Sequence, residues 1–312
     1  MGGICLFNRE IEGHSLWAWT AAAVSAPMLQ FLGSIPWHWS LLGGLGAGAL
    51  WLLAERAGGV CRWKPAAAVQ LLFLIVCAGA AAAWSGACWI GAERPWTVPG
   101  VLLVLAACAS ETGPQAGARC GAVVFWFLAG MLLLLCAFAL PDVKWAWLAP
   151  AEEGPRLPAA LLLVPAVGGL LPRKRGSSPW PWALGLGLGG VAVSLLTVGA
   201  LSPAVAGRTQ GAFFEMARGI SILGVAERFE AVVAAAMTLG WFCLLSLLLT
   251  AAGKMAETLH TGWGRPGVWL SALGAAALMP WGREAPPWLL AAGAILLWCL
   301  LPIACGKQKK EA

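Results

Sequence analysis

The sequence predicts an all-α integral membrane protein of about ten transmembrane helices, forming a single polytopic domain over residues 1–312. Three observations predict this fold class. The chain is 60% hydrophobic and 11% charged, whereas a soluble domain carries about 25% charged residues. Apolar runs recur along its whole length. Lysine and arginine are dense in every second connection. So few charges cannot cover a water-facing surface, so we expect a lipid bilayer around the chain.

Proline, glycine and charged residues divide the chain into ten apolar segments. The segments span residues 15–33, 37–54, 65–89, 96–110, 120–140, 157–171, 181–201, 226–252, 266–281 and 287–305. A helix that crosses the bilayer needs about 20 residues, so the fourth, sixth and ninth segments are short. Many of the 20 tryptophans lie near segment ends, which is typical of aromatic belts at the two membrane interfaces.

The lysines and arginines predict the orientation. With the N-terminus inside, the inner side holds 13 of them and the outer side 6, with Arg228 inside a segment. Positive charge favours the cytoplasmic side, so we expect ten spans with both termini in the cytoplasm. The net charge of +6 is then an orientation signal, and no nucleic-acid partner is expected.

Segments five apart resemble each other, which predicts a five-plus-five inverted repeat. The second reads LLGGLGAGALWLL and the seventh ALGLGLGGVAVSLL, and the fourth and ninth are both short. The first and sixth both carry helix breakers, so we expect helices 1 and 6 to be broken. Paired breaks of this kind indicate a transporter-type site. The alternative is that glycine and proline are common in any membrane helix.

A broken helix leaves free backbone N–H and C=O groups, which a zwitterion such as an amino acid can satisfy. A glycine at the break, Gly168 or Gly169, would let the backbone approach the ligand. Thr238 continues a face of small residues along the eighth segment. The expected ligand-binding residues are Ser25, Ala26, Pro27, Pro165, Gly168, Gly169 and Thr238.

No constellation in the sequence indicates catalysis or a cofactor. The 10 cysteines are scattered, and no two have CxxC spacing. The three histidines lie far apart from one another and from any cysteine or acid cluster. We therefore expect no metal, no cofactor and no catalytic residue. Gln70, Ser85, Ser194 and Thr197 are expected to bond local backbone carbonyls.

Several passages resemble the endospore germination permease family, the B subunit of spore germinant receptors. The first is FFEMARGISILGVAERFEAVVAAAMTLGWFCLLSLLL, which matches an R-x-I-S-I…E-R-x-E passage at the eighth helix. The second runs from PWTVPG to APAEEG, with Arg119 opening the fifth helix and Leu140–Pro141 closing it. The ending CLLPIACGKQKKEA is similar to the family's tenth helix and basic tail. The resemblance spans nearly the whole chain, although the sixth segment is compact and lacks polar residues.

The resemblance implies a fold and a role. The family belongs to the amino acid–polyamine–organocation superfamily, with a ten-helix inverted repeat. Its B subunits lie in the inner spore membrane, pair with A-type and C-type subunits, and sense a small germinant that is often an amino acid. The implied function is a germinant-sensing membrane subunit, and the alternative is a secondary transporter of amino acids or related organic ions.

Charges at the start of the eighth segment suggest a structural cluster. It comprises Arg218, Glu227, Arg228 and Glu230. One interpretation is that Glu230 and Arg228 pair with neighbouring helices, because charges inside a membrane normally pair. The other is that these charges lie in water at the outer interface and cap the helix, since glutamate is favourable near a helix N-terminus.

Overall fold

The computed structural model describes residue 7 and residues 10–32, 35–57, 63–86, 96–148, 159–174, 178–209, 211–219 and 229–303. Within them the protein is a bundle of helices, and its only β contact is a parallel bridge between Ile11 and Arg173. The α-helices are α1 (Gly13–Phe31), α2 (Trp37–Ala57), α3 (Lys64–Gly86), α4 (Thr97–Glu111), α5 (Pro114–Ala139), α6 (Ala159–Gly168), α7 (Trp180–Leu201), α8 (Pro203–Ala206), α9 (Ala212–Gly219), α10 (Phe229–Leu259), α11 (Gly264–Gly282) and α12 (Pro287–Ala294). Two 3-10 turns, η3 (Leu140–Asp142) and η4 (Trp145–Leu148), follow α5, and a π-helical turn, η5 (Ile295–Leu300), follows α12.

Each of the ten predicted apolar segments coincides with a described helix. Among the described residues, four helical stretches are long and apolar enough to cross a membrane: Lys64–Gly86, Pro114–Asp142, Trp180–Leu201 and Ala231–Leu259. Thr97–Glu111 and Pro287–Ile303 are shorter apolar helices. The protein is therefore an all-α integral membrane protein, while the ten spans and the inverted repeat stay predictions.

Prolines set several helix boundaries. Pro114 stands in the first turn of α5, after Gly113 with φ of 94°. Proline suits this position because its missing N–H has no intrahelical partner there, and glycine adopts a positive φ at little cost. The predicted start of the fifth segment at residue 120 was therefore too late, and Arg119 lies within α5 rather than opening it.

The first helix is continuous, contrary to the prediction of a break. α1 runs unbroken through Ser25 and Ala26 and contains Pro27. Proline removes one hydrogen bond and crowds the preceding turn, but Ser25 Oγ donates to the carbonyl of Ala22 at 2.6 Å. Burial of most of α1 holds the helix together despite its proline.

The sixth helix does end early, at Gly168. With 10 residues, α6 is about 15 Å long, too short to cross a bilayer. Its last turn closes through bonds from Leu170 N to Val167 O at 2.9 Å and from Leu171 N to Gly168 O at 3.2 Å. Leu170 and Leu171 are buried, so α6 ends inside the protein.

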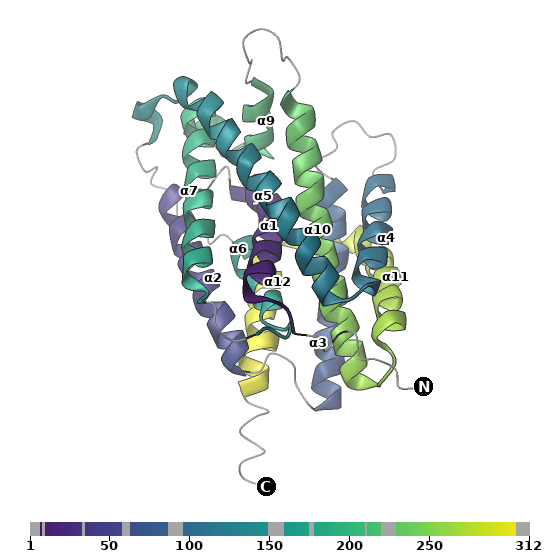
Figure 1. Cartoon of the computed structure of the whole chain (residues 1–312). Coiled ribbons are helices and arrows are strands. Elements are labelled where there is room, and N and C mark those ends of the chain that lie inside the picture. Colours follow the sequence, from purple (N-terminus) through teal and green to yellow (C-terminus); the bar gives the residue numbers. More distant parts are fainter. Residues whose placement is uncertain are drawn as a thin grey trace.

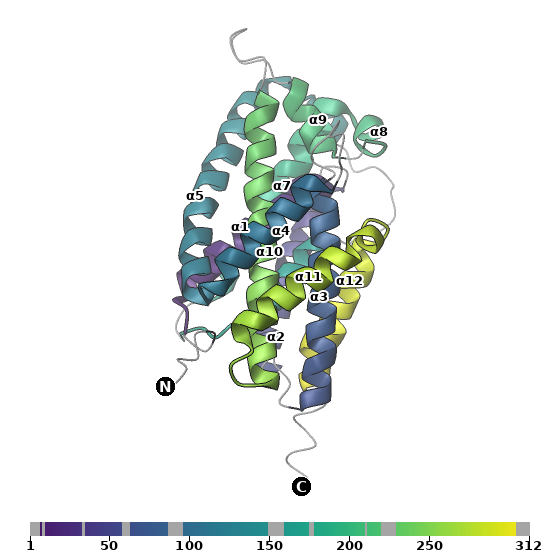
Figure 2. The ribbon, with the colours of Figure 1, turned by 90° about the vertical axis from the view of Figure 1, so that its right-hand side faces the viewer.

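Several helix contacts fit the predicted five-plus-five repeat. The first half comprises α1 to α5, the second half comprises α6, α7, α10, α11 and α12, and some contacts between two helices recur between their counterparts in the other half. α2 packs on α7 and α1 on α6. The contact of α3 with α11 has its counterpart in α10 with α4, and that of α1 with α5 in α6 with α12. In Figure 1, α2 and α7 lie on the left and α4 and α11 on the right, with α10 between them. Figure 2 shows α11 crossing α3, with α12 beside them.

Glycine and serine allow α2 and α7 to approach closely. A Cβ built on Gly44 would lie 2.5 Å from the Cα of Gly187 and 2.8 Å from the carbonyl oxygen of Ala183. Beside this contact the hydroxyls of Ser40 and Ser194 bond each other at 3.0 Å, and Ser194 also donates to Leu32 O at 3.2 Å. The expected local bond of Ser194 is therefore wrong, whereas Thr197 bonds Val193 O locally at 2.7 Å as predicted.

Candidate functional site

The ligand-binding residues predicted on α1 lie against α10. A Cβ built on Gly240 of α10 would lie 2.8 Å from the Cβ of Ala26 and 2.8 Å from Ser25 Oγ. Thr238 lies two residues before Gly240 and therefore about 200° around α10; it is half-buried and donates to Ala234 O at 2.7 Å. We call Ser25, Ala26 and Gly240 the α1–α10 seam. The seam is closed, because the two helices approach at small residues.

Pro27 gives the seam a backbone acceptor. It has no N–H to donate to the carbonyl of Ala23, four residues earlier, which lies in the buried part of α1. Such a carbonyl is a suitable partner for an ammonium group. The seam residues carry no ionisable side chain, so recognition there would rest on backbone and hydroxyl groups.

The residues predicted on α6 lie in a different place. A side chain on Gly168 would collide with the Trp51 ring of α2, and its Cβ would lie 3.0 Å from Thr20 Oγ1. A Cβ on Gly169 would lie 2.8 Å from that of Ala54, and Pro165 is buried within α6. The small size of Gly168 and Gly169 thus serves the packing of α6 on α2, and their part in ligand binding stays a prediction.

The two predicted sets are therefore not side by side. Thr20, beside Gly168, and Ser25, beside Gly240, are five residues apart on α1. At 1.5 Å per residue that separation is about 7.5 Å along the helix axis. Ser25 and Ala26 meet α10 at the seam, Thr238 lies on another face of α10, and Gly168 and Gly169 pack further along, against α2 and Thr20.

The predicted charge cluster is described only in part. Glu227 and Arg228 lie outside the described residues, as does the side chain of Glu230, whose backbone is in the first turn of α10. Arg218 pairs with Glu215 on α9, with Nη1 3.2 Å from Oε1, and both side chains are exposed. The pairing of Glu230 and Arg228 stays a prediction.

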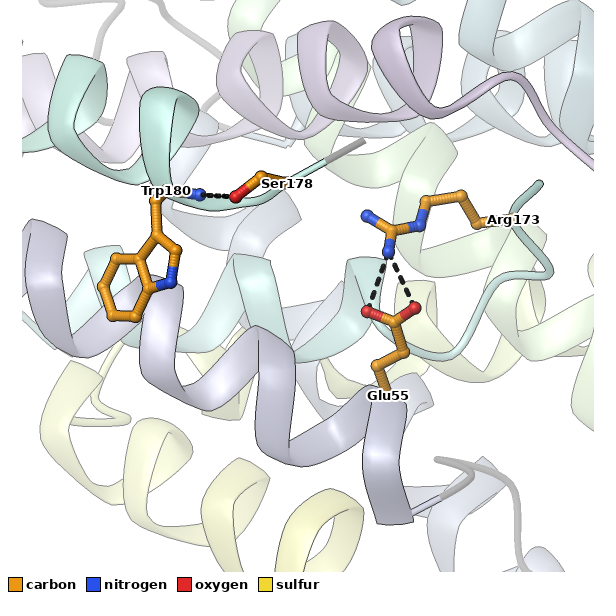
Figure 3. Close-up of polar contacts among 4 residues, drawn as sticks. All are labelled: Glu55, Arg173, Ser178 and Trp180. Carbon is orange, nitrogen blue, oxygen red and sulfur yellow. Dashed lines mark hydrogen bonds and ion pairs between the residues drawn. The ribbon is translucent and has the colours of Figure 1, made fainter. Parts of the chain in front are cut away.

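An ion pair between a largely buried arginine and a partly exposed glutamate, which the sequence analysis missed, joins α2 to the chain after α6. Arg173 Nη2 lies 2.7 Å from Glu55 Oε1 and 2.9 Å from Oε2 (Figure 3). The Arg173 side chain is 10% exposed and that of Glu55 is 38% exposed. The guanidinium carbon lies 5.8 Å from the centre of the Trp17 ring, within the range of a cation–π contact.

Tryptophans complete this group, which we call the Arg173 cluster: Arg173, Glu55, Trp17 and Trp51. The Trp17 and Trp51 rings lie 3.7 Å apart at 31°. The backbone of Ile11 adds two bonds, from Ile11 N to Pro172 O and from Lys174 N to Ile11 O, both at 3.0 Å. The sequence signal was the spacing of Trp51 and Glu55, which places both on one face of α2.

Two cavities adjoin the seam helices. One, of about 180 Å³, lies between α1, α5 and α7 and includes Ser25 and Met28 in its lining. The other, of about 160 Å³, lies between α4, α5 and α10, next to Trp19. There Trp19 Nε1 donates to Ser246 Oγ at 3.3 Å, and Ser110 Oγ donates to Ser246 O at 3.0 Å. The lining of neither cavity includes an Asp, Glu, His, Lys or Arg side chain.

Within the described residues, no three His, Cys, Asp or Glu side chains are grouped closely enough to hold a metal ion. Gln70 Nε2 donates to Leu297 O at 2.7 Å, across to the π-helical turn η5, and its expected bond to a local carbonyl stays a prediction. Polar groups of this kind hold helices together.

Comparison with solved structures identifies the fold. The structure of MhsT in complex with L-phenylalanine matches with a TM-score of 0.64 over 95% of this chain and 89% of that chain, at 12% sequence identity. No protein-family model matches the chain, and no curated protein matches it in sequence. At this identity the likeness shows the fold alone. It is the transporter-type fold that the sequence resemblance implied, whereas membership of the germination permease family stays a prediction.

Proposed function

We propose that the protein is the germinant-sensing membrane subunit of a spore germination receptor and binds a small amino-acid-like ligand. The observation that carries the ligand class is the fold match over 95% of the chain to a protein solved with L-phenylalanine. The resemblance of the passage from Arg218 to Glu230 supports the receptor role. The proposal assigns no catalysis, and its partners are the A-type and C-type receptor subunits.

The ligand site of this proposal is the α1–α10 seam in an opened form. Separation of α1 from α10 would uncover the Ser25 hydroxyl together with the Ala23 carbonyl, which Pro27 cannot bond. The part assigned to the Thr238 hydroxyl rests on the sequence prediction. Carbonyl and hydroxyl oxygens at the seam would accept from the ligand's ammonium group. In the closed seam the same groups bond within their own helices, so ligand binding and helix separation would be coupled.

Topology forms part of the proposal. We place ten spans in the inner spore membrane with both termini in the cytoplasm, arranged as a five-plus-five inverted repeat. The recurrence of helix contacts between the halves supports the repeat, and the 13-to-6 distribution of lysine and arginine supports the orientation. Labelling of Ser178→Cys on a cysteine-free background tests it, because a label that reaches position 178 from outside an intact cell contradicts the topology.

Binding of amino acids to the purified full-length protein tests the ligand class. Equilibrium binding of L-phenylalanine and a panel of other amino acids is measured by calorimetry. Ser25→Ala and Thr238→Val each remove one hydroxyl with little change in shape, and each is expected to weaken binding roughly tenfold, since a hydrogen bond to a charged group contributes about 1.5–3 kcal/mol. Thr209→Val, at an exposed hydroxyl away from the seam, is the matched control.

Absence of binding by every amino acid contradicts the ligand class. Normal binding by both hydroxyl variants places the site elsewhere. A secondary transporter is the second candidate, favoured by the transporter-type fold itself. Uptake of the bound amino acid into proteoliposomes favours the transporter, while binding without uptake, together with co-purification of A-type and C-type subunits, favours the receptor.

A further inference from the structure

The cavity between α1, α5 and α7 has a lining unlike that of an amino-acid site. It has a volume of about 180 Å³, and its lining includes Phe125, Leu128 and Leu132 of α5 and Trp182 of α7. The only hydroxyl in the lining is that of Ser25, which already donates to Ala22 O at 2.6 Å. A carboxylate placed there would lose its hydration and find no donor in the described lining, and an ammonium group would find only the Ser25 oxygen as an acceptor side chain. The occupant must therefore be uncharged and apolar.

The cavity lies between two helices that cross the membrane. α5 and α7 are among the stretches long and apolar enough to do so. Large apolar side chains beside the cavity point outward, such as Trp126, 70% exposed, on α5 and Leu188, 60% exposed, on α7. A surface of this kind faces lipid chains in an integral membrane protein. The gap between α5 and α7 therefore opens toward the bilayer interior.

The gap is bounded at both ends, which makes it a window. At one end the rings of Phe125 and Trp182 meet edge to face, with centres 5.2 Å apart. Near the other end Lys144 N donates to Gly199 O at 3.0 Å. In Figure 1, α5 runs obliquely across the molecule beside α7. Behind the window lies α1, whose Met28 and Leu29 are otherwise buried.

We propose that the end of a lipid acyl chain enters this window and contacts α1. An apolar cavity of about 150 Å³ accommodates a benzene molecule, so the space here suits the terminal carbons of one chain. The lining is uncharged and includes the pliable side chains of Met28 and Met131, as an acyl chain requires. This assignment is independent of the germinant proposal, since it concerns an occupant that comes from the membrane.

Two glycines of α7 allow the window to be filled. A Cβ built on Gly185 meets nothing within 4 Å, and one on Gly189 lies 3.8 Å from Met28 Cε, an ordinary contact. Both glycines line the cavity and leave room for a Cβ, so Gly185→Leu and Gly189→Leu each add a side chain at the cavity wall. Gly130→Leu is the matched control, because a Cβ there also meets nothing within 4 Å and Gly130 is exposed on α5 outside the lining.

Photo-crosslinking tests the proposal. The full-length protein is placed in nanodiscs of phosphatidylcholine that carries a diazirine near the end of one acyl chain, and adducts are mapped by peptide mass spectrometry. Adducts on α5 and α7 arise from any surrounding lipid, so the readout is the α1 peptide with Met28 and Leu29. We expect that peptide to be labelled in the parent and in Gly130→Leu, and labelling to fall severalfold in Gly185→Leu and Gly189→Leu.

Three results overturn the proposal. One is labelling of α1 in the parent no higher than that of the buried stretch 77–83 of α3. Another is unchanged α1 labelling in both filled variants. The third is that free L-phenylalanine abolishes labelling of the α1 peptide while α5 stays labelled. That result would show that the small ligand, and not an acyl chain, occupies the cavity. Thermal stability is measured for every variant, and the parent's α1 label stands as a result even if one variant fails to fold.

Discussion

Two arginine–glutamate pairs in this protein have the same chemistry but different surroundings. Arg218 and Glu215 are three residues apart on α9, with side chains 48% and 36% exposed. Arg173, only 10% exposed, reaches Glu55 from a distant part of the chain. In Figure 1, α9 lies at the top of the molecule, while the end of α2 that carries Glu55 lies toward the bottom. The α9 pair restrains one short helix, whereas the Arg173 cluster joins α1, α2 and the chain after α6.

From this comparison we expect the surroundings of an ion pair to determine how much it contributes to the free energy of unfolding. An exposed pair contributes about 0–1 kcal/mol, because water solvates both charges when they separate. Loss of one partner from a buried pair leaves a charge that water does not reach. The Arg173 guanidinium also lies over Trp17, which itself stacks on Trp51. Substitutions in the two regions therefore differ in size, and they can be ranked.

Trp51→Ala is expected to have the largest effect. Trp51 is 1% exposed, stacks on Trp17 and fills the space beside Gly168. Truncation of a buried tryptophan costs about 3–5 kcal/mol, so a large fall in the thermal unfolding temperature in detergent is expected. Trp281→Ala, at a side chain 75% exposed, is the control. Equal unfolding temperatures for the two variants would mean that the cluster does not hold the fold together.

Glu55→Gln is expected to be next in size. The amide keeps the shape but removes the negative charge, which leaves Arg173 partly buried without its counter-ion. A hydrogen bond to a charged group contributes about 1.5–3 kcal/mol, and the exposure of Glu55 favours the lower part of that range. The measurement is thermal unfolding at two salt concentrations. A loss no greater than that of Glu215→Gln at both salt concentrations would contradict the distinction between the two pairs.

Gly168→Leu is expected to destabilise the protein by overpacking. The added side chain would collide with the Trp51 ring, and an overfilled core costs about 1–3 kcal/mol. Membrane abundance and unfolding temperature should both fall, while Gly130→Leu, where a Cβ meets nothing within 4 Å, should leave both unchanged. If Gly168→Leu has normal abundance but no longer binds amino acids, the result would instead indicate that Gly168 lies in the ligand site.

Glu215→Gln is expected to have the smallest effect. Its pair lies within one helix at the surface, where such pairs contribute roughly 0–1 kcal/mol. The unfolding temperature should change little and should not depend on salt. A fall as large as that of Glu55→Gln would show that α9 carries more of the stability than its exposure indicates.

The long apolar helices could be predicted from the sequence because each one carries its own signal. Runs such as those of α3 and α10 need no knowledge of their neighbours, and prolines and glycines mark their ends. α9 escaped prediction because it has only eight residues, of which four are buried apolar side chains: Ala212, Phe213, Met216 and Ala217. So short an amphipathic helix depends on contacts with α7 and α10, which no local pattern records.

The candidate site was less predictable, because it depends on contacts between distant segments. Pro27 indicated a break, but the burial of α1 and the bond of Ser25 keep the helix continuous. Gly168 and Gly169 were predicted to let the backbone approach a ligand; in the structure the backbone there approaches α2, and the ligand contact stays a prediction. Arg173 stood out only as part of a basic loop, since nothing in the sequence shows that Glu55, 118 residues earlier, lies against it.

The contact between α2 and α7 has a mechanical consequence. At Gly44 and Gly187 the two helices meet backbone to backbone. The hydrogen bond of 3.0 Å between the Ser40 and Ser194 hydroxyls links the two helices beside this contact. Side chains that interlock can change rotamer and let helices slide, but bare backbone offers no such freedom. We therefore expect α2 and α7 to move as one rigid body. A tilt of α2 would tilt α7 by the same angle.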